Sequence, residues 1–494
     1  MSRAIPRGSR ARESDAQKSG AQKSGARESR ADDGWSPDLR RFGRPHYLAI
    51  VEAIAEDVRT GRLAVAERLP PQRVLAARLG LNFTTVARGY VEAQGRGLVE
   101  SRVGQGTFVC DPARGLPPSR PALPRRHEAV DFSMNLPPEP DDPRLLARMR
   151  AGVAAIADDL PNLLRYQGFG GTDADKEAGG LWLGRRGVVA GHDRLLLCPG
   201  AHSALDAILG SVAQAGDVLC TEALTYAGIR SLAAHRGLRL VGLPMDAEGL
   251  EPDAFAAACT RLAPKALYLN PTLQNPTTRT IGWDRREAIV AVARRYDVVI
   301  VEDDAYGFVC PEPPPSFQQL APEITYHVAG LAKCLGAGLR LAYCVAPSAR
   351  AALPLASTLR AATVMASPIT TALATRWIRD GTGEAVLGFI RTESRARQAI
   401  AARLLPPELV RSDPNGFHLW MHLPEGWTRS AFASQGRAAG LGVVASDAFC
   451  AAGPAPEAVR ICLGGVGSRA EVAQALEVLA HALGRAPTLA SAYI

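Results

Sequence analysis

One lysine, Lys333, stands in the apolar stretch "AGLAKCLGAGLR" (329–340), where the next charged residue is Arg340. Burying an amine costs free energy unless the amine is paired or neutralised, so a lysine in this setting needs an explanation. Two interpretations are open from this stretch alone. Lys333 could lie at the surface with its stem along apolar neighbours, or its amine could attack a carbonyl group.

Other chemically useful residues also follow apolar, strand-like segments. They are Asn275, Asp303, Tyr306, Arg340 and, at an expected helix start, Ala201 and His202. The set supplies a carboxylate, a phenol, an amide and an anion site made of helix amides and an arginine. Pyridoxal phosphate needs these parts together with a lysine, because it bonds to the amine, pairs its ring nitrogen with a carboxylate and places its phosphate among donors. The residues therefore predict pyridoxal 5'-phosphate as the cofactor.

The segments that must position these residues alternate in type from about residue 130 to 484. Short apolar runs such as "RLLLCPG" (194–200), "KALYLNP" (265–271) and "LAYCVAP" (341–347) read as buried strands, many with helical stretches between them. This alternation predicts an α/β domain with a mostly parallel sheet, whose ligands lie at the carboxyl ends of the strands. We assign this domain to residues 129–494.

The order and spacing of these residues resemble the fold type I aminotransferases. The chain carries the Asn-Pro-Thr loop in "YLNPTLQNPTT", the D-x-x-Y motif in "VEDDAYG" and an imperfect S-x-S-K-x-x-x-x-G-x-R signature at 330–340. The resemblance implies that Lys333 is the Schiff-base lysine, that Asp303 pairs with the pyridine nitrogen and that Tyr306 donates to the ring oxygen. It also implies contacts to the cofactor from Asn275, Tyr226, Ala201, His202 and Arg340.

Two further residues enter through the same resemblance. Tyr166, in "YQGFGG", matches a tyrosine that reaches the phosphate of the other subunit, which implies a homodimer. Arg460, in "AVRICLGG", matches an arginine that holds the carboxylate of a bound amino compound through a bidentate fork. Each motif alone is also typical of an ordinary turn or a surface arginine, so the interpretation rests on their combination and order.

The signature departs from the family at two positions. Gly330 and Ala332 replace the serines before the lysine, which removes at least one hydroxyl group that could bond the phosphate. A hydrogen bond to a charged group is worth roughly 1.5 to 3 kcal/mol. The sequence therefore predicts weakened rather than abolished cofactor binding, as expected of a sensor more than of an efficient enzyme.

The positive charge of the chain gathers in its first quarter. The whole chain has a formal net charge of +8, and residues 41–126 hold 14 arginines against 7 acidic residues. Such a surplus points toward a polyanion. Three helical patterns, the third with Asn82 as its N-cap, and two short strands around Gly104 predict a winged helix-turn-helix over residues 39–110.

The run "LPPQRVLAARLG" and the wing "GQGT" resemble the DNA-binding domain of GntR-type regulators, which makes operator DNA the expected partner. The resemblance implies DNA contacts for Arg73, Asn82, Thr84, Arg88 and Gly104, although Arg88 could instead merely solvate the outer face of its helix. Phe83 stands at the start of the expected recognition helix, where the family usually has an arginine that can contact guanine.

The remaining features of the sequence predict a tail, a linker and the cellular location of the protein. The "AQKSG" repeats predict a disordered, basic, low-complexity tail over 1–38, and five prolines with four arginines predict a semi-rigid linker over 111–128. Nine scattered cysteines without C-x-x-C spacing fit reduced thiols and a cytoplasmic protein without a bound metal. No run approaches the ~18 apolar residues of a membrane helix.

The two domains together resemble MocR-type regulators, a subfamily of the GntR family. The favoured hypothesis is a transcription regulator that depends on pyridoxal phosphate and senses an amino compound, with a carboxylate, through an external aldimine. One alternative is an active aminotransferase with an accessory DNA-binding domain, in which Lys333 carries the proton transfer. Another is a DNA-binding protein whose large domain is a scaffold without a cofactor. The effector, the operator and the sign of regulation stay open.

Overall fold

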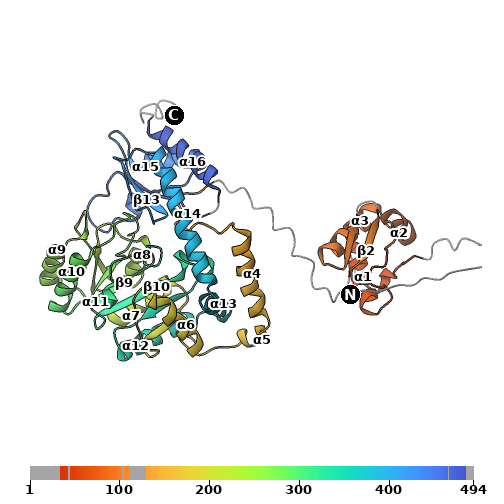
Figure 1. The fold of residues 1–494 in the computed structure, drawn as a ribbon, viewed down its shortest axis with the longest axis horizontal. Coiled ribbons are helices and arrows are strands. Elements are labelled where there is room, and N and C mark those ends of the chain that lie inside the picture. The colour runs from red at the N-terminus through yellow and green to blue at the C-terminus, as the bar shows by residue number, and fades with distance from the viewer. Residues whose placement is uncertain (1–33, 43–44, 103–104, 111–129, 466, 485–494) are drawn as a thin grey trace, which may run out of the picture. The chain divides into compact units, whose positions relative to one another are not determined.

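The computed structural model of the chain describes residues 34–42, 45–102, 105–110, 130–465 and 467–484. The chain divides into two units, Met1–Arg126 and His127–Ile494 (Figure 1). The expected linker, 111–128, lies outside the described residues, as do residues 1–33 of the expected tail.

The first unit is a winged helix-turn-helix, as predicted. Its elements are η1 (Leu39–Arg41), α1 (His46–Arg59), α2 (Gln72–Leu79), α3 (Phe83–Gly95), β1 (Val99–Arg102) and β2 (Gly106–Val109). The strands pair antiparallel, with Val99 opposite Val109. Ile50 and Ile54 of α1 pack with Val86 of α3 in one apolar core, since each helix turns its apolar stripe inward.

Local sequence signals fix the turn between α2 and α3. Gly80 follows α2 with a φ of +63°, a left-handed conformation that favours glycine. Asn82 then caps α3, because its side-chain oxygen accepts a hydrogen bond of 3.1 Å from the backbone N–H of Thr84. The predicted N-cap is confirmed.

Residues before α1 also pack on this unit. The indole nitrogen of Trp35 donates to Asp57 at 2.7 Å, and Arg78 donates to the carbonyl of Gly34 at 2.6 Å. Trp35 and Leu39 lie partly buried against the core. Residues 34–38, which the sequence placed in the tail, therefore have defined contacts with the winged helix-turn-helix.

The second unit is built on a sheet of the order β3-β11-β10-β9-β8-β4-β5. Its strands are β3 (Leu195–Cys198), β4 (Val218–Glu222), β5 (Arg239–Leu243), β8 (Ala266–Leu269), β9 (Val299–Asp303), β10 (Thr325–Gly330) and β11 (Ala342–Val345). The pairs are parallel except those that β11 makes with β10 and β3, so the predicted mostly parallel sheet is confirmed. The strand β11 runs antiparallel because the segment from β10 to β11 is too short for a helical crossover.

Side chains of the sheet alternate between two apolar layers. Leu195 and Leu197 of β3 pack in one layer, whereas Leu196 and Cys198 pack in the other. Helices cover both layers, namely α4 (Pro143–Ala157), α5 (Leu160–Leu163), α6 (Asp173–Gly184), α7 (Ala201–Val212), α8 (Ala227–His235), α9 (Pro252–Leu262), α10 (Trp283–Arg295), α11 (Phe317–Leu320), α12 (Ala349–Thr363), α13 (Pro368–Arg379) and α14 (Thr382–Leu404). The central strands β8, β9 and β10 are almost wholly buried, as expected of a parallel sheet that is covered on both faces.

A smaller antiparallel sheet lies in the C-terminal part of the same unit. Its order is β12 (Val410–Ser412), β13 (His418–His422), β15 (Ala458–Cys462) and β14 (Val444–Ala445), packed with α15 (Arg429–Ala438) and α16 (Arg469–Leu483). Short elements complete the unit: β6 (Met245–Asp246), β7 (Gly249–Leu250), η3 (Leu331–Lys333), η4 (Ala337–Leu339) and η5 (Ser446–Ala448). Figure 1 shows α14 reaching from the large sheet to the small one, and its residues enter both cores.

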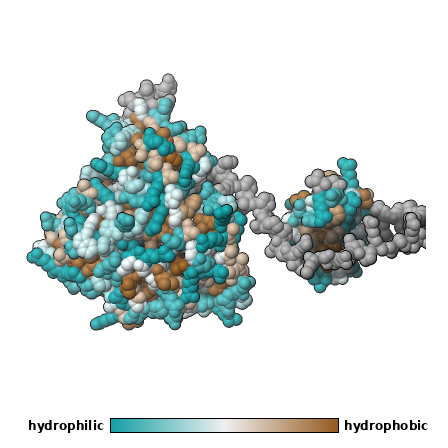
Figure 2. Space-filling view, viewed as in Figure 1, coloured by the Kyte–Doolittle hydropathy of each residue, from teal (hydrophilic) through white to brown (hydrophobic). Residues whose placement is uncertain are grey.

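The visible surface of the second unit is mainly hydrophilic, with apolar residues gathered near α6 and α12 (Figure 2). Exposed side chains on these helices include Leu181 and Leu353. None of the described helices combines the length and apolarity that crossing a membrane requires.

Two consecutive arginines after α6 make ion pairs of opposite exposure. Arg186 Nε lies 2.7 Å from an oxygen of Asp304, and the side chains are 3% and 0% exposed. Arg185 pairs with Glu384, and those side chains are 45% and 44% exposed. Water screens the second pair, whereas loss of one partner in the first leaves an isolated buried charge.

We expect Arg186→Met to lower the free energy of unfolding of the second unit by about 3–5 kcal/mol, because Asp304 stays buried without its cation. Arg185→Ala is the matched control and should cost at most ~1 kcal/mol. Urea unfolding of the full chain, followed by tryptophan fluorescence, measures both values. Equal shifts of the two midpoints would contradict the argument from burial.

Candidate functional site

A cavity of about 400 Å³ lies where β8, β9 and β10 end and α7 begins. Parallel strands direct their carboxyl ends to one edge of a sheet, and ligands of open α/β sheets bind there. The residues predicted for the cofactor and its ligand that line this cavity are Lys333, Asp303, Tyr306, Asn275, Tyr226, Ala201, His202, Arg340 and Arg460. Tyr166 is not among the lining residues, and its side chain is 85% exposed.

Asp303 ends β9 with its carboxylate buried beside the cavity. One carboxylate oxygen accepts a hydrogen bond of 2.8 Å from the Tyr268 hydroxyl, and the other has no partner among the described residues. Burial raises the pKa of Asp303 to about 6, against the opposing effect of the Tyr268 hydrogen bond. The free oxygen can therefore accept a cationic N–H from a ligand, which would restore the charged form.

The two carboxylates that flank Asp303 are occupied elsewhere. Glu302 accepts from His327 at 2.8 Å and from the backbone N–H of Phe317 at 2.9 Å, and Asp304 pairs with Arg186. These contacts fix the end of β9 from the side away from the cavity. In the sequence "EDD" the three acids look alike, and the structure leaves only the middle one facing the site.

Lys333 is half-buried at the end of η3 and lines the same cavity as Asp303. Its ammonium nitrogen donates to the backbone carbonyl of Asn135. Burial lowers the pKa of Lys333 from an ordinary value of 10.5 to about 8. A larger fraction of the amine is therefore neutral near pH 7 than for an exposed lysine, and the neutral amine is the nucleophile.

Asn135 is a site residue that the sequence did not indicate. Its side-chain nitrogen donates to the Tyr306 hydroxyl at 2.7 Å, while its carbonyl accepts from Lys333. Asn135 lies in an irregular segment, where neither periodicity nor a motif marked it. Asn270 was missed too, although it follows a predicted strand; its amide donates to the carbonyl of Asp303 at 2.6 Å and accepts from the Asn275 N–H at 2.9 Å.

The other end of the cavity is suited to an anion. The helix α7 starts after Gly200, whose φ is +90° and which, as a glycine, has no side chain to cap the first N–H groups. A Cβ placed on Gly200 would lie 3.2 Å from a guanidinium nitrogen of Arg340, so this cation lies beside the helix start. Helix amides and an arginine together form a phosphate-binding arrangement.

Gly330 and Ala332, where the family has serines, both line the cavity. A Cβ on Gly330 would lie 3.2 Å from the Cβ of Ala201, which is closer than most such contacts. The positions of the missing hydroxyl groups therefore face the anion end, and Ala201 occupies part of the space that a side chain at 330 would need.

Arg460 approaches the cavity from β15 of the small sheet. One guanidinium nitrogen donates to Asn275 at 3.0 Å, another donates to the backbone carbonyl of Ser133, and Nε has no partner among the described residues. The guanidinium also lies 5.0 Å from the centre of the Phe449 ring. A buried arginine with an unused N–H can donate a hydrogen bond to the carboxylate of a ligand.

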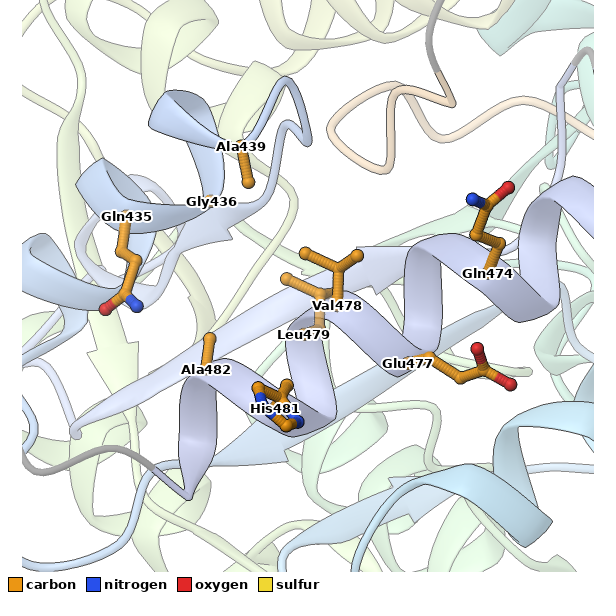
Figure 3. A pocket seen from close by; sticks show the side chains of 9 residues that line it. All are labelled: Gln435, Gly436, Ala439, Gln474, Glu477, Val478, Leu479, His481 and Ala482. Carbon is orange, nitrogen blue, oxygen red and sulfur yellow. The ribbon is translucent and has the colours of Figure 1, made fainter.

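A second hollow, between α15 and α16, differs in chemistry. Figure 3 shows Val478 and Ala482 of α16 facing Gly436 of α15 and Ala439, which follows α15. The polar residues of this lining are Gln435, Gln474, Glu477 and His481. The described residues that line it include neither a lysine nor an arginine that could hold a phosphate.

The residues predicted to contact DNA lie around the start of α3. Arg73, Asn82 and Thr84 are exposed there, and Arg73 lies 5.8 Å from the centre of the Phe83 ring. The guanidinium of Arg88 stacks at 4.0 Å on the Tyr47 ring of α1, which holds it against its own domain. Gly104 lies outside the described residues.

The residues of the large cavity fit pyridoxal 5'-phosphate. The free oxygen of Asp303 suits a protonated ring nitrogen, the amine of Lys333 suits an aldehyde, and the anion end at α7 suits a phosphate. When bound, this cofactor supplies an electrophilic carbonyl and an electron-accepting ring.

Comparison with known proteins agrees with both units. The family model for aminotransferase class I and II matches residues 128–479, and the model for bacterial regulatory proteins of the gntR family matches residues 46–109. YdeF of Bacillus subtilis, an uncharacterized HTH-type transcriptional regulator, is 26% identical over 454 residues, which cover 91% of this chain and 96% of YdeF.

Two further proteins, a regulator and an aminotransferase, are also similar to this chain. MocR of Rhizobium meliloti, a probable rhizopine catabolism regulatory protein, is 26% identical over 285 residues, or 53% of this chain and 56% of MocR. The structure of LysN, an α-aminoadipate aminotransferase from Thermus thermophilus, superposes with a TM-score of 0.66 at 24% identity and covers 74% of this chain and 94% of LysN. The chain belongs to the aminotransferase class I and II family and joins that domain to a gntR-family regulatory domain, in the arrangement of MocR-type regulators.

Proposed function

We propose that the protein is a transcription regulator that binds operator DNA through its first unit and pyridoxal 5'-phosphate through its second. The observation that carries this proposal is the cavity in which Lys333, Asp303 and Arg340 meet, in a chain that begins with a basic winged helix-turn-helix. A dedicated enzyme has no need of a DNA-binding domain, and a pure scaffold has no need of a half-buried lysine and a buried carboxylate in one cavity.

The cofactor roles that we propose are those that the family resemblance implies. Lys333 would bond to the aldehyde carbon, Asp303 would balance the charge of the ring nitrogen, and Tyr306 with Asn275 would hold the ring oxygen. Tyr226 would lie against the ring, and Arg340 would hold the phosphate with the amides of Ala201 and His202. All of these residues line one cavity.

The ligand that we propose is an amino compound with a carboxylate group. Its amine would replace Lys333 on the cofactor, and its carboxylate would bind Arg460, whose Nε is buried without a partner among the described residues. Because Arg460 belongs to the small sheet and Lys333 to the large one, a bound ligand would bridge the two sheets. A ligand shifts a conformational equilibrium only by its difference in affinity for the two states.

We also propose a homodimer in which Tyr166 reaches the phosphate site of the partner subunit. Tyr166 is far too exposed for a core residue, and Leu164 beside it is 71% exposed. Neighbouring apolar side chains at the surface are typical of an interface.

An active aminotransferase is the second candidate, because the lowered pKa of Lys333, about 8, suits an amine that transfers protons. The two candidates differ in one observable. Repeated conversion of an amino donor and a keto acid by the full chain favours the enzyme, whereas binding or a single half-reaction favours the regulator.

Asp303→Asn should weaken binding of pyridoxal phosphate by about 10- to 150-fold, since a hydrogen bond to a charged group contributes roughly 1.5 to 3 kcal/mol. Absorbance titration of the full chain with the cofactor measures the affinity. The control is Asp206→Asn, which removes a half-buried carboxylate that pairs with Arg236 outside the cavity lining. Equal affinities of wild type and Asp303→Asn would overturn the role given to Asp303.

The rate at which pyridoxal phosphate attaches to Lys333 should rise with pH through a midpoint at about 8 and level off above it. Only the neutral amine attacks the aldehyde, and burial lowers the pKa of Lys333 to about 8, so the plateau comes at a lower pH than for free lysine. Stopped-flow absorbance between pH 6 and 10 follows the reaction, with N-acetyl-lysine as the reference amine. A rate that keeps rising to pH 10 in both reactions would contradict a lowered pKa of Lys333.

Arg73→Ala should weaken binding of DNA duplexes of every sequence and lower the slope of log affinity against log salt by about one, because one phosphate contact is lost. Fluorescence anisotropy at several salt concentrations measures the slope. The control is Arg59→Ala, since Arg59 is an exposed arginine of α1 that pairs with Glu56. An unchanged slope for Arg73→Ala removes this residue from the proposed interface.

A further inference from the structure

An aromatic side chain stands exposed at the first residue of α3. Phe83 is 44% exposed and does not belong to the apolar core of its unit, to which α3 contributes Val86, Tyr90 and Ala93. Phenylalanine loses favourable burial at such a position. Phe83 therefore adds little to the apolar core, and the exposed part of its ring is available to a partner.

The surroundings of Phe83 suit a nucleic-acid surface. Arg73 of α2 lies 5.8 Å from its ring, and Thr84 beside it is exposed. Asn82 caps the helix with its own oxygen. The first residues of a recognition helix are the ones that reach base edges in the major groove, so Phe83 is placed where sequence is read.

The arginines of α3 and of its C-cap make contacts within the domain. Arg88, five residues after Phe83, has its guanidinium 4.0 Å from the centre of the Tyr47 ring. Arg96, the C-cap at the opposite end of α3 from Phe83, pairs with Glu92 at 3.1 Å and with Glu52 at 2.9 Å. Between the exposed polar residues Asn82 and Thr84, the start of α3 presents the apolar ring of Phe83. In the major groove the apolar group on a base edge is the C5-methyl of thymine.

We propose that Phe83 is a specificity-determining residue that packs against the methyl group of a thymine in the operator, while Arg73 contacts the adjacent backbone. The inference rests on the proposed DNA-binding function and adds the base that α3 selects. The basic surplus of residues 41–126 provides the charge complementarity that brings the duplex to this surface.

The test uses the full chain and a selection of bound duplexes from a random-sequence library. Each thymine of the selected consensus is then replaced by deoxyuridine, which removes the methyl group and keeps every hydrogen-bonding atom. At one position of each half-site the affinity should fall about fourfold, the value of one buried methyl-sized group. With Phe83→Ala the two duplexes should bind equally well, as expected when the partner of the methyl is gone.

Two variants complete the design. Phe83→Leu keeps an apolar side chain and should retain most of the preference for thymine, and Val91→Ala removes another exposed apolar residue of α3, two turns away, and should leave the preference unchanged. The readout is a ratio between two duplexes on one protein, so a partly inactive preparation does not alter it.

The outcomes separate the two claims. If no duplex is selected, the proposed DNA-binding function fails and this inference fails with it. If duplexes bind but no thymine methyl matters, or if Phe83→Ala keeps the wild-type ratio, DNA binding stands and only the role of Phe83 is overturned.

Discussion

The buried carboxylate of Asp303 is the constraint on which the site depends. A charge removed from water is stable only when partners replace the lost hydration. Tyr268 supplies one partner, and the other oxygen is left without one among the described residues. The end of β9 must therefore be held rigidly by other contacts, which Glu302 and Asp304 make to the surrounding elements. The unpartnered oxygen of Asp303 is therefore held in a fixed position, where it can accept a hydrogen bond from a ligand.

The large sheet explains why residues distant in sequence meet at this carboxylate. Its strands are covered on both faces, and the polar side chains that line the cavity follow or end the strands β8, β9 and β10. Segments from outside the large sheet then close the cavity. Asn135 reaches Tyr306 and Lys333 from the segment that opens the second unit, and Arg460 reaches Asn275 from the small sheet. The cavity is thus lined both by residues of the large sheet and by residues from the small sheet and the segment around Asn135.

Much of this organisation could be predicted from the sequence, because apolar strands and the polar residues after them are local signals. The parallel sheet, the winged helix-turn-helix and the cap at Asn82 were predicted correctly. Contacts between distant segments left no such signal. Asn135 lies in an irregular stretch, and Tyr268 looked like any strand aromatic, although its hydroxyl meets Asp303. The antiparallel direction of β11 depends on the short connection from β10. The pattern of apolar residues in β11 does not indicate that direction.

The close approach of Gly330 and Ala201 has a consequence for any change of this site. A Cβ at 330 would lie 3.2 Å from that of Ala201, so a side chain at 330 fits only if residue 201 shifts slightly. Residues in contact have non-additive effects. Substitutions at the two positions are thus expected to be coupled, because a larger residue at 201 would take the space that a serine at 330 needs. The hydroxyl group that the phosphate end lacks depends on two positions and not on one.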